Sequence, residues 1–206
     1  MTEGYLRQSA LAPLGLNARS GDDTAGVRMG ERPFFTMIGL RGDATDPGFT
    51  GGIEKTLGFA LPLAPNTVTG KGKKSALWMG PDEWMIVTAP DTAAKTLSGL
   101  HDALSGQHVA VFDVSDSRTI IELSGKNARE VLMKGCGIDI HPRAFGPGQC
   151  AQSTLALAHV LIHQTAQHKK TGAPTYHIYV HRSFAEYLWA WLEDAGGEYG
   201  IAICAS

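Results

Sequence analysis

The chain has 206 residues, of which 18% are charged, and its formal net charge is −2 with neutral histidines. This balance excludes the strongly basic surface that binds nucleic acids or anionic membranes. The three cysteines form no CxxC pair, which is typical of free thiols in a reducing compartment. The sequence shows no signal peptide and no run of ~20 apolar residues, so we expect a soluble, cytoplasmic protein.

Residues 1–32 predict an irregular leader. Glycine, alanine, aspartate and arginine are mixed there without an apolar period, and such a segment does not bury enough surface to become ordered alone. It is either a disordered leader or an arm that becomes ordered on a partner subunit. We favour the arm.

The first folded unit, residues 33–114, opens on an apolar run of strand length, Phe34–Leu40. Asp46 and Pro47 then provide a helix cap and a first-turn proline. The helix that follows has apolar residues at helical spacing and is expected to end at two prolines; these residues are Phe49, Ile53, Leu57 and Leu61, then Pro62 and Pro65. The polar, glycine-rich segment Asn66–Lys74 predicts a turn or a mobile loop.

An antiparallel strand pair is expected next, Ser75–Met79 with Trp84–Thr88, joined by the turn residues Gly80–Glu83. A second helix and a strand complete the unit; they comprise a cap at Asp91, the apolar residues Ala93, Leu97, Leu100 and Leu104, a stop at Gly106 and the strand Val109–Phe112. The predicted order is therefore β-α-β-β-α-β.

The second unit, residues 115–206, is expected to repeat this plan. A strand at Thr119–Leu123 directs Ile121 and Leu123 to one face, and Arg118 and Glu122 to the other. A short helix capped by Ser124 and further strands follow; the helix includes Ala128, Val131 and Leu132 and ends at Gly135, and the strands are Ala151–Ala158, Val160–Gln164 and Thr175–His181.

The last helix begins at Ser183–Glu186, which has the pattern of a capping box. Its main apolar face comprises Phe184, Tyr187, Leu188, Trp191, Leu192 and Ala195. Trp189 lies off that face and is a candidate exposed interface residue. A final strand is expected at Ile201–Cys204. We therefore predict an α+β fold: one compact domain of two similar β-α-β-β-α-β units with antiparallel or mixed sheets.

Two patterns invite a ligand-binding interpretation and fail it. Gly70–Ser75 resembles a phosphate loop, but its spacing is wrong and a strand is expected after it, so a solvated cationic hairpin is favoured. The histidines form two i,i+4 pairs, His159 with His163 and His177 with His181. In strands such residues lie ~13 Å apart. Histidines on neighbouring strands can still converge, but no ligand-spaced carboxylate or cysteine accompanies them, so structural or exposed histidines are favoured over a metal site.

The segment Asp113–Arg118 joins the two units and is dense in polar groups. A catalytic carboxylate with an arginine clamp is one interpretation. We favour a linker whose Asp and Ser side chains cap backbone donors, with Arg118 paired to an aspartate or to Glu122. His141–Arg143 is the other candidate polar cluster. Cys136 follows a helix C-terminus, where the dipole does not activate a thiol, so a packed small hydrophobe is expected.

Several collinear motifs between Phe35 and Gly200 resemble the gamma subunit of the heterotetrameric sarcosine oxidases. They are Asn66–Val68, Gly80–Trp84, Asp113–Thr119, Gly135-Cys136, His141–Phe145 with Pro147-Gly148, Cys150–Gln152 and Arg182–Ala185. The resemblance implies a shortened form of the folate-binding domain of the glycine-cleavage T-protein. It also implies a heterotetramer with alpha, beta and delta subunits.

Such complexes oxidatively demethylate sarcosine to glycine, with hydrogen peroxide and 5,10-methylenetetrahydrofolate as further products. The resemblance places FAD, FMN and NAD on the alpha and beta subunits, and zinc on delta. It makes gamma a structural subunit and assigns no catalytic, cofactor-binding or metal-binding residue to this sequence. Two alternatives stay open: a gamma-like subunit of a related N-methyl-amino-acid dehydrogenase, or a free-standing folate-binding aminomethyltransferase-like protein. For the latter we expect a longer chain than one ending at Ser206.

Overall fold

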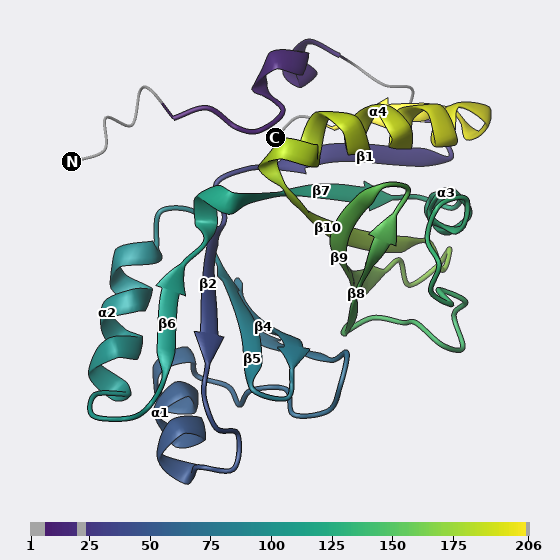
Figure 1. Ribbon diagram of the computed structural model, residues 1–206. Coiled ribbons are helices and arrows are strands. Elements are labelled where there is room, and N and C mark those ends of the chain that lie inside the picture. The colour runs from purple at the N-terminus through teal and green to yellow at the C-terminus, as the bar shows by residue number, and fades with distance from the viewer. Residues whose placement is uncertain (1–6, 20–23, 205–206) are drawn as a thin grey trace.

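The computed structural model describes residues 7–19 and 24–204. The chain forms an α+β fold with two β-sheets, and helices cover the outer side of each sheet (Figure 1). Within the described ranges, no helix is both long enough and apolar enough to cross a membrane.

Sheet B and its two helices come from the first half of the chain. In chain order these elements are β2 (Thr36–Arg41), α1 (Pro47–Leu57), β3 (Val68–Lys71), β4 (Lys74–Gly80), β5 (Glu83–Thr88), α2 (Ala93–Ala103) and β6 (Ala110–Asp113). The strands lie in the spatial order β3-β4-β5-β2-β6, and each neighbouring pair is antiparallel.

Sheet A is formed by the second half of the chain together with one early strand, β1 (Val27–Arg32). The later elements are β7 (Arg118–Ser124), α3 (Ala128–Met133), β8 (Gln149–Leu155), β9 (Ala158–Gln167), β10 (Pro174–His181), α4 (Ala185–Gly196) and β11 (Ile201–Ile203). The spatial order is β11-β1-β7-β10-β9-β8. The sheet is mixed because β1 pairs parallel with β11 and antiparallel with β7.

The two halves share one topology. Each runs strand, helix, three strands, helix, strand. The first unit has one strand more than predicted, β3, whereas the three strands between the helices of the second unit were each expected from the sequence. Their spatial orders also correspond: β3-β4-β5-β2-β6 in sheet B matches β8-β9-β10-β7-β11 in sheet A, except that β1 is inserted between β7 and β11. Two sheets of matching topology agree with the expected pair of similar α+β units.

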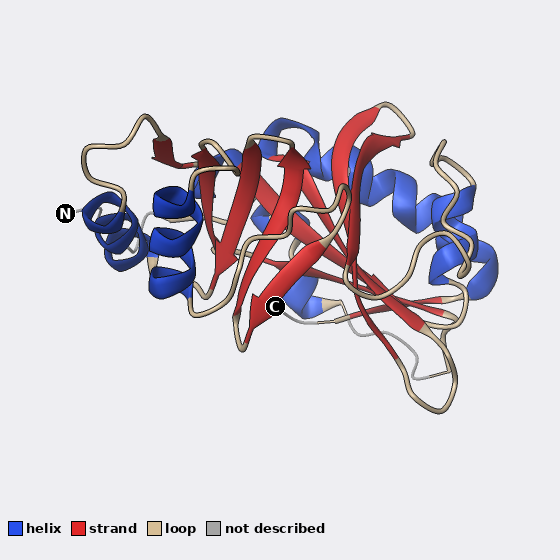
Figure 2. Cartoon of the chain, turned by 90° about the horizontal axis from the view of Figure 1, so that it is seen from below, coloured by secondary structure: helices blue, strands red, loops and turns tan. Residues whose placement is uncertain are grey.

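Three apolar clusters separate four layers. One lies between sheet A and the helices α3 and α4, and a second lies between sheet B and the helices α1 and α2. The third joins the facing sides of the two sheets; it contains Met37, Leu77, Met85 and Val87 from sheet B and Ile120, Cys150, Leu161 and Tyr179 from sheet A. Seen from below, the strands lie between the two groups of helices (Figure 2).

The predicted irregular leader is wrong for residues 27–32, which form β1. The strand is buried over most of its length, with Val27 and Met29 in the core of sheet A. The local pattern does not indicate this strand, because its pairing partners lie about ninety to one hundred and seventy residues further along the chain. Residues 1–6 and 20–23 of the predicted leader lie outside the described residues.

The rest of the described leader packs against its own chain. It contains two 3-10 turns, Ala12–Leu14 and Leu16–Ala18, and the side chains of Leu11 and Leu16 are buried in the core of sheet A. The Leu11 amide donates to the Glu31 carboxylate at 3.3 Å, and the Thr119 hydroxyl donates to the same oxygen at 2.7 Å. Residues 7–19 therefore do not need a partner subunit to find an apolar surface.

Helix starts and stops were only partly predicted. Asp46 caps α1 as expected, accepting a hydrogen bond from the Gly48 amide at 2.7 Å. The helix stops at Leu57, before the prolines, because Gly58 adopts a left-handed φ of 86°. Leu61 is still buried, although it lies beyond the helix.

The other three predicted caps are wrong. Asp91 has a φ of 59° and precedes the N-cap of α2, which is Thr92. Ser124 belongs to β7, where it pairs with Arg28. No capping box forms at α4, because Arg182–Phe184 is a 3-10 turn and places Phe184 at the N-cap without a side-chain bond. In each case the residue that the local pattern assigned to a helix cap lies instead in a neighbouring strand or turn.

Two further predictions are corrected by tertiary contacts. The segment Asn66–Lys74 contains β3, which pairs with β4 instead of forming a loop throughout. The Trp189 side chain is fully buried between α4 and sheet A. Phe184 and Tyr187, on the predicted apolar face, are 42% and 39% exposed. The buried side chains of α4 follow the ordinary three- and four-residue spacing of a helical face, and that face includes Trp189; they are Ala185, Leu188, Trp189, Leu192 and Ala195. The predicted face was anchored on Phe184, which lies in the 3-10 turn before the helix.

Candidate functional site

The polar join between the two halves satisfies its own backbone, as the linker interpretation predicted. Ser115–Ser117 forms a 3-10 turn, and the Asp113 carboxylate accepts a hydrogen bond from the Ser115 amide at 2.9 Å. The Ser115 hydroxyl in turn accepts from the Met37 amide at 3.0 Å, so the join is fastened to β2. The side chains of Asp113 and Ser115 therefore stabilise the backbone of the join.

Glu122 is not the partner of Arg118. Its carboxylate accepts two hydrogen bonds from the Arg32 guanidinium, at 2.8 and 3.1 Å, and lies 3.2 Å from the His177 ring nitrogen Nε2. The bond to His177, together with the contacts to Arg32, lowers the pKa of Glu122 to about 2. Glu122 is therefore an ionised structural carboxylate and not a proton donor.

The four histidines of the two i,i+4 pairs lie at two different places on sheet A. His163 and His177 are directly opposite each other on β9 and β10, and their rings meet edge-on at 6.3 Å between centroids. His163 is buried, which lowers its pKa to about 3, so the ring is neutral. His159 and His181 lie nearer to Arg118. No group of three His, Cys, Asp or Glu side chains within residues 7–19 and 24–204 is arranged to hold a metal ion.

Burial of neutral His163 predicts a stability that depends on pH. Below about pH 6.5 the unfolded chain binds a proton at this ring, but the folded chain does so only near pH 3. This contribution of His163 to stability is therefore fully present above about pH 6.5. It decreases as the pH is lowered, by up to ~1.4 kcal/mol per pH unit. We expect His163→Gln to flatten the decline between about pH 6.5 and pH 5 in urea unfolding experiments.

The exposed His101 on α2 provides the matched control for this prediction. His101→Gln should retain the decline of the unmodified chain. Glu122 acts in a lower window, since its folded pKa of about 2 removes stability only as pH falls below about 4.5. An equally steep decline in His163→Gln between about pH 6.5 and pH 5 contradicts the assignment.

The cysteines, the glycine- and lysine-rich motif and the His141–Arg143 loop take part in packing or in local hydrogen bonds. The Cys136 thiol is partly buried against the core of sheet A and lies 3.8 Å from the Ser153 hydroxyl. Cys150 is buried between the sheets, and burial raises its pKa to about 12. The glycine- and lysine-rich motif forms the hairpin between β3 and β4, as predicted, with Gly72 at a φ of 64°. In the His141–Arg143 loop, the His141 ring nitrogen Nδ1 accepts from the Arg143 amide at 3.2 Å.

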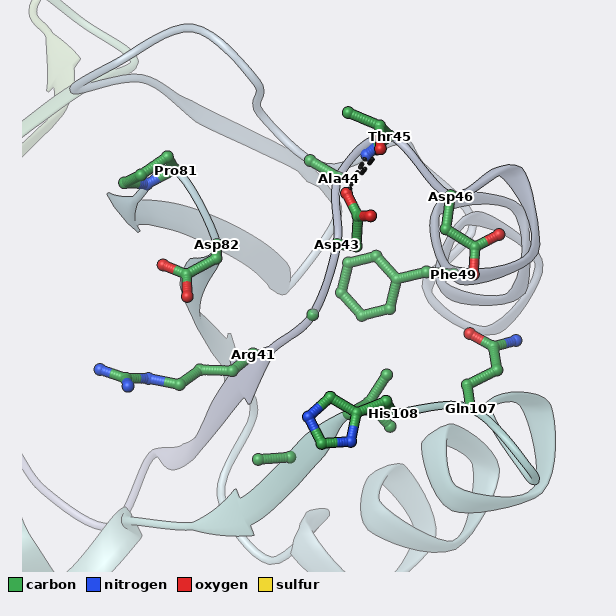
Figure 3. Close-up of a pocket in the computed structure, with 13 residues that line it drawn as sticks. Arg41, Asp43, Ala44, Thr45, Asp46, Phe49, Pro81, Asp82, Gln107 and His108 are labelled. Atoms are coloured by element: carbon green, nitrogen blue, oxygen red, sulfur yellow. Dashed lines mark hydrogen bonds between the residues drawn. The ribbon is translucent and has the colours of Figure 1, made fainter.

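A corner cavity of about 820 Å³ lies at the edge of sheet B. Figure 3 shows the Phe49 ring and His108 within it, with Arg41 and the carboxylates of Asp43, Asp46 and Asp82 around them. The sequence identified only the Asp46 cap and the turn at Gly80–Glu83 in this region. The cavity forms because α1 and the segment after α2 converge on the end of β2, and their separation in sequence hides this.

The charged groups of the corner cavity are held by local contacts. Asp43 accepts hydrogen bonds from the Thr45 hydroxyl at 2.7 Å and the Thr45 amide at 2.8 Å, which lower the pKa of its carboxyl. Asp46 caps α1, and Arg41 forms an ion pair with Glu83 at 2.7 Å. The arrangement is that of a rigid corner, and no side chain in it is paired as a nucleophile with a base.

A second hollow, here named the seam groove, lies where sheet A meets the end of β4. It has a volume of about 330 Å³; its polar lining is Arg118, Gln152, Ser153, Thr154, His159 and His181, and its apolar lining is Met79, Val160, Leu161 and Tyr179. Arg118, His159 and His181 are candidates from the sequence, each on separate grounds. Alternation of residues along β8 and β9 was the available signal for Gln152, Thr154 and His159, but strand order was needed to bring them together.

Comparisons with known proteins agree with this architecture. The family model described as "Sarcosine oxidase, gamma subunit family" matches residues 41–198. A sarcosine oxidase subunit gamma from Arthrobacter sp is 35% identical over 198 residues, which cover 94% of this chain and 92% of that protein.

Solved structures show the same relationship. A chain of the heterotetrameric sarcosine oxidase from Corynebacterium sp. U-96, solved in complex with pyrrole 2-carboxylate, superposes with a TM-score of 0.83 and 31% identity. The match covers 94% of this chain and 96% of that one. The glycine cleavage aminomethyltransferase T from Bartonella henselae matches with a TM-score of 0.64 and 15% identity over 91% of this chain and 49% of its own. The expected T-protein-like fold is therefore confirmed, and the chain belongs to the sarcosine oxidase gamma subunit family.

Proposed function

We propose that this chain is the gamma subunit of a heterotetrameric sarcosine oxidase and supplies shape and contact area while other subunits carry out the redox chemistry. The observation that carries the proposal is the match, over nearly the full length of both chains, to a chain of the heterotetrameric enzyme from Corynebacterium sp. U-96. The expected partners are the alpha, beta and delta subunits, in the cytoplasm.

The proposed assembly demethylates sarcosine oxidatively to glycine, forms hydrogen peroxide from oxygen, and transfers the one-carbon unit to tetrahydrofolate as 5,10-methylenetetrahydrofolate. FAD, FMN, NAD and zinc belong to the other subunits in this proposal. Several carboxylates of the chain already have hydrogen-bond or ion-pair partners within it, which supports a non-catalytic role. Asp43, Asp46 and Asp113 accept hydrogen bonds from nearby residues, and Glu83 and Glu122 are in ion pairs.

An exposed apolar patch on sheet A and α4 supports assembly with a larger subunit. Leu157, in the turn between β8 and β9, is 77% exposed, and its amide donates a hydrogen bond to the Tyr187 hydroxyl at 3.3 Å. Phe184 meets Tyr187 edge-on at 6.5 Å between ring centroids. Aromatic side chains such as Phe and Tyr are enriched in the buried centre of protein interfaces. We assign this patch to contact with a flavin-carrying subunit.

Two measurements test the proposal. The purified full chain should show no bound flavin in its visible absorbance spectrum and no sarcosine turnover, whereas co-expression with the other subunits should give an active complex that contains it. Stoichiometric flavin on the chain alone, or turnover by it, contradicts the non-catalytic role.

The patch is tested separately within the same co-purification. Leu157→Asp should reduce recovery of the flavin-carrying subunits by about tenfold or more, since it places a charge in a desolvated contact. Leu63→Asp is the matched control, because Leu63 is 59% exposed but precedes β3, away from α4. Equal recovery with both variants removes the patch from the interface and leaves the assembly itself to be judged from co-purification of the unmodified chain.

A further inference from the structure

Four adjacent strands of sheet A place polar side chains in one row along the seam groove. Arg118 on β7 is directly opposite His181 on β10, and His159 on β9 is directly opposite Thr154 on β8. The strands are neighbours in the order β7-β10-β9-β8. Cross-strand partners share one face of a sheet, so all four side chains are directed toward the same side.

Arg118 lacks the carboxylate partner that a partly buried guanidinium usually has. Among the described residues, its guanidinium donates to a single acceptor, the Met85 sulfur at 3.5 Å, which is a weak one. No described carboxylate lies within ion-pair distance of it: Glu122 pairs with Arg32 and His177, and Glu83 pairs with Arg41. Most of the N–H donors of Arg118 are therefore available to a ligand.

The local potential of the groove is positive. Burial lowers the pKa of Arg118, and the nearest opposing charge is Glu83. Burial, followed by the charges of Arg118 and His159, also lowers the pKa of His181. The His181 ring is therefore neutral near pH 7, and Arg118 carries the positive charge of the row.

The groove walls complete a site of small-molecule size. Gln152 donates to the Met79 carbonyl at 2.7 Å and so fixes the rim where sheet A meets β4. Leu161 and Tyr179 belong to the apolar cluster between the sheets and support the floor. The volume of about 330 Å³ exceeds that of a single carboxylate or phosphate group and leaves space for the rest of a small ligand.

We infer that the seam groove binds a small molecule through its carboxylate or phosphate group, with Arg118 as the principal ligand and His159, His181 and Thr154 beside it. This activity is separate from the assembly role. The planar fork of a guanidinium holds either group through two parallel hydrogen bonds.

Titration of the full chain with inorganic phosphate and, separately, with acetate tests the inference at constant ionic strength. Side-chain NMR signals of Arg118, His159 and His181 should shift together and saturate in the millimolar range. Arg118→Gln should weaken phosphate binding by at least about tenfold, because a charge-assisted pair is lost. Arg118→Lys should bind with intermediate affinity. Phosphate should raise the melting temperature of the unmodified chain but not that of Arg118→Gln.

Arg143→Gln is the matched control, because Arg143 is an exposed arginine in a loop away from the groove. It should retain both the affinity and the thermal shift. Circular dichroism of Arg118→Gln shows whether its fold is intact, and Arg118→Lys provides the comparison if it is not. Absence of saturation, or shifts spread equally over the surface lysines, overturns the inference. So does binding by the isolated chain that disappears in the assembled complex, since a partner's carboxylate would then fill the groove.

Discussion

Trp189→Ala should lower the free energy of unfolding by about 3–5 kcal/mol, the cost of removing a large aromatic side chain from a packed core. Trp189 is fully buried between α4 and sheet A, in the same cluster as Leu188 and Leu192. For a chain of this size such a loss lowers the melting temperature by about 10 °C. Chemical denaturation monitored by circular dichroism gives the free energy directly.

Met133→Ala is the matched control for the loss of an apolar side chain. Met133 lies at the end of α3 and is 62% exposed, so its replacement should change stability by no more than about 0.5 kcal/mol. If Trp189→Ala were as mild as this control, Trp189 would face solvent or a partner subunit, as the sequence pattern alone suggested.

Gly125→Ala should destabilise the fold by about 3 kcal/mol. Gly125 has a φ of 116°, which side chains with a Cβ rarely adopt, and an added Cβ would lie 2.4 Å from the Gly26 carbonyl oxygen. The residue lies between β7 and α3, where the segment before β1 crosses closely, and the Asn127 amide donates to that same Gly26 oxygen at 3.1 Å. Backbone strain contributes about 1–3 kcal/mol, and the contact with a backbone oxygen adds to it.

Gly58→Ala separates the two contributions. Gly58 also has a positive φ, of 86°, but no atom lies within 4 Å of its added Cβ. Its replacement should therefore cost only the conformational strain, about 1–2 kcal/mol. Equal losses in the two variants, measured by urea unfolding, would show that the Gly26 backbone moves aside and that the close approach is not a fixed feature of the fold.

The candidate site was predicted one residue at a time. The sequence marked Arg118, His159 and His181, but it assigned Arg118 to an ion pair with an aspartate or Glu122. In the structure Glu122 forms its ion pair with Arg32 instead, and Arg32 lies on β1, a strand that the sequence did not predict. Because β1 brings Arg32 next to β7, the Arg118 guanidinium is left without a carboxylate. One missed strand therefore changed the chemistry assigned to the groove.

The sequence by itself determined the features that local geometry controls. Asp46 and Pro47 start α1, Gly80–Glu83 form the turn between β4 and β5, and the alternation along Thr119–Leu123 directs Ile121 to one core and Glu122 to the opposite face. The repeated order of elements also indicated the α+β fold. Each of these depends on residues a few positions apart, whose backbone preferences and periodicity act before any tertiary contact.

Only the tertiary structure decided which segments became neighbours. It ordered Val27–Arg32 as a strand between β7 and β11, buried Leu11 and Trp189, and assembled the seam groove from four strands. The physical reason is that burial and strand pairing are satisfied by the whole chain at once. A weak local pattern becomes ordered when distant residues supply hydrogen bonds and apolar surface, and a strong one is overridden when they do not.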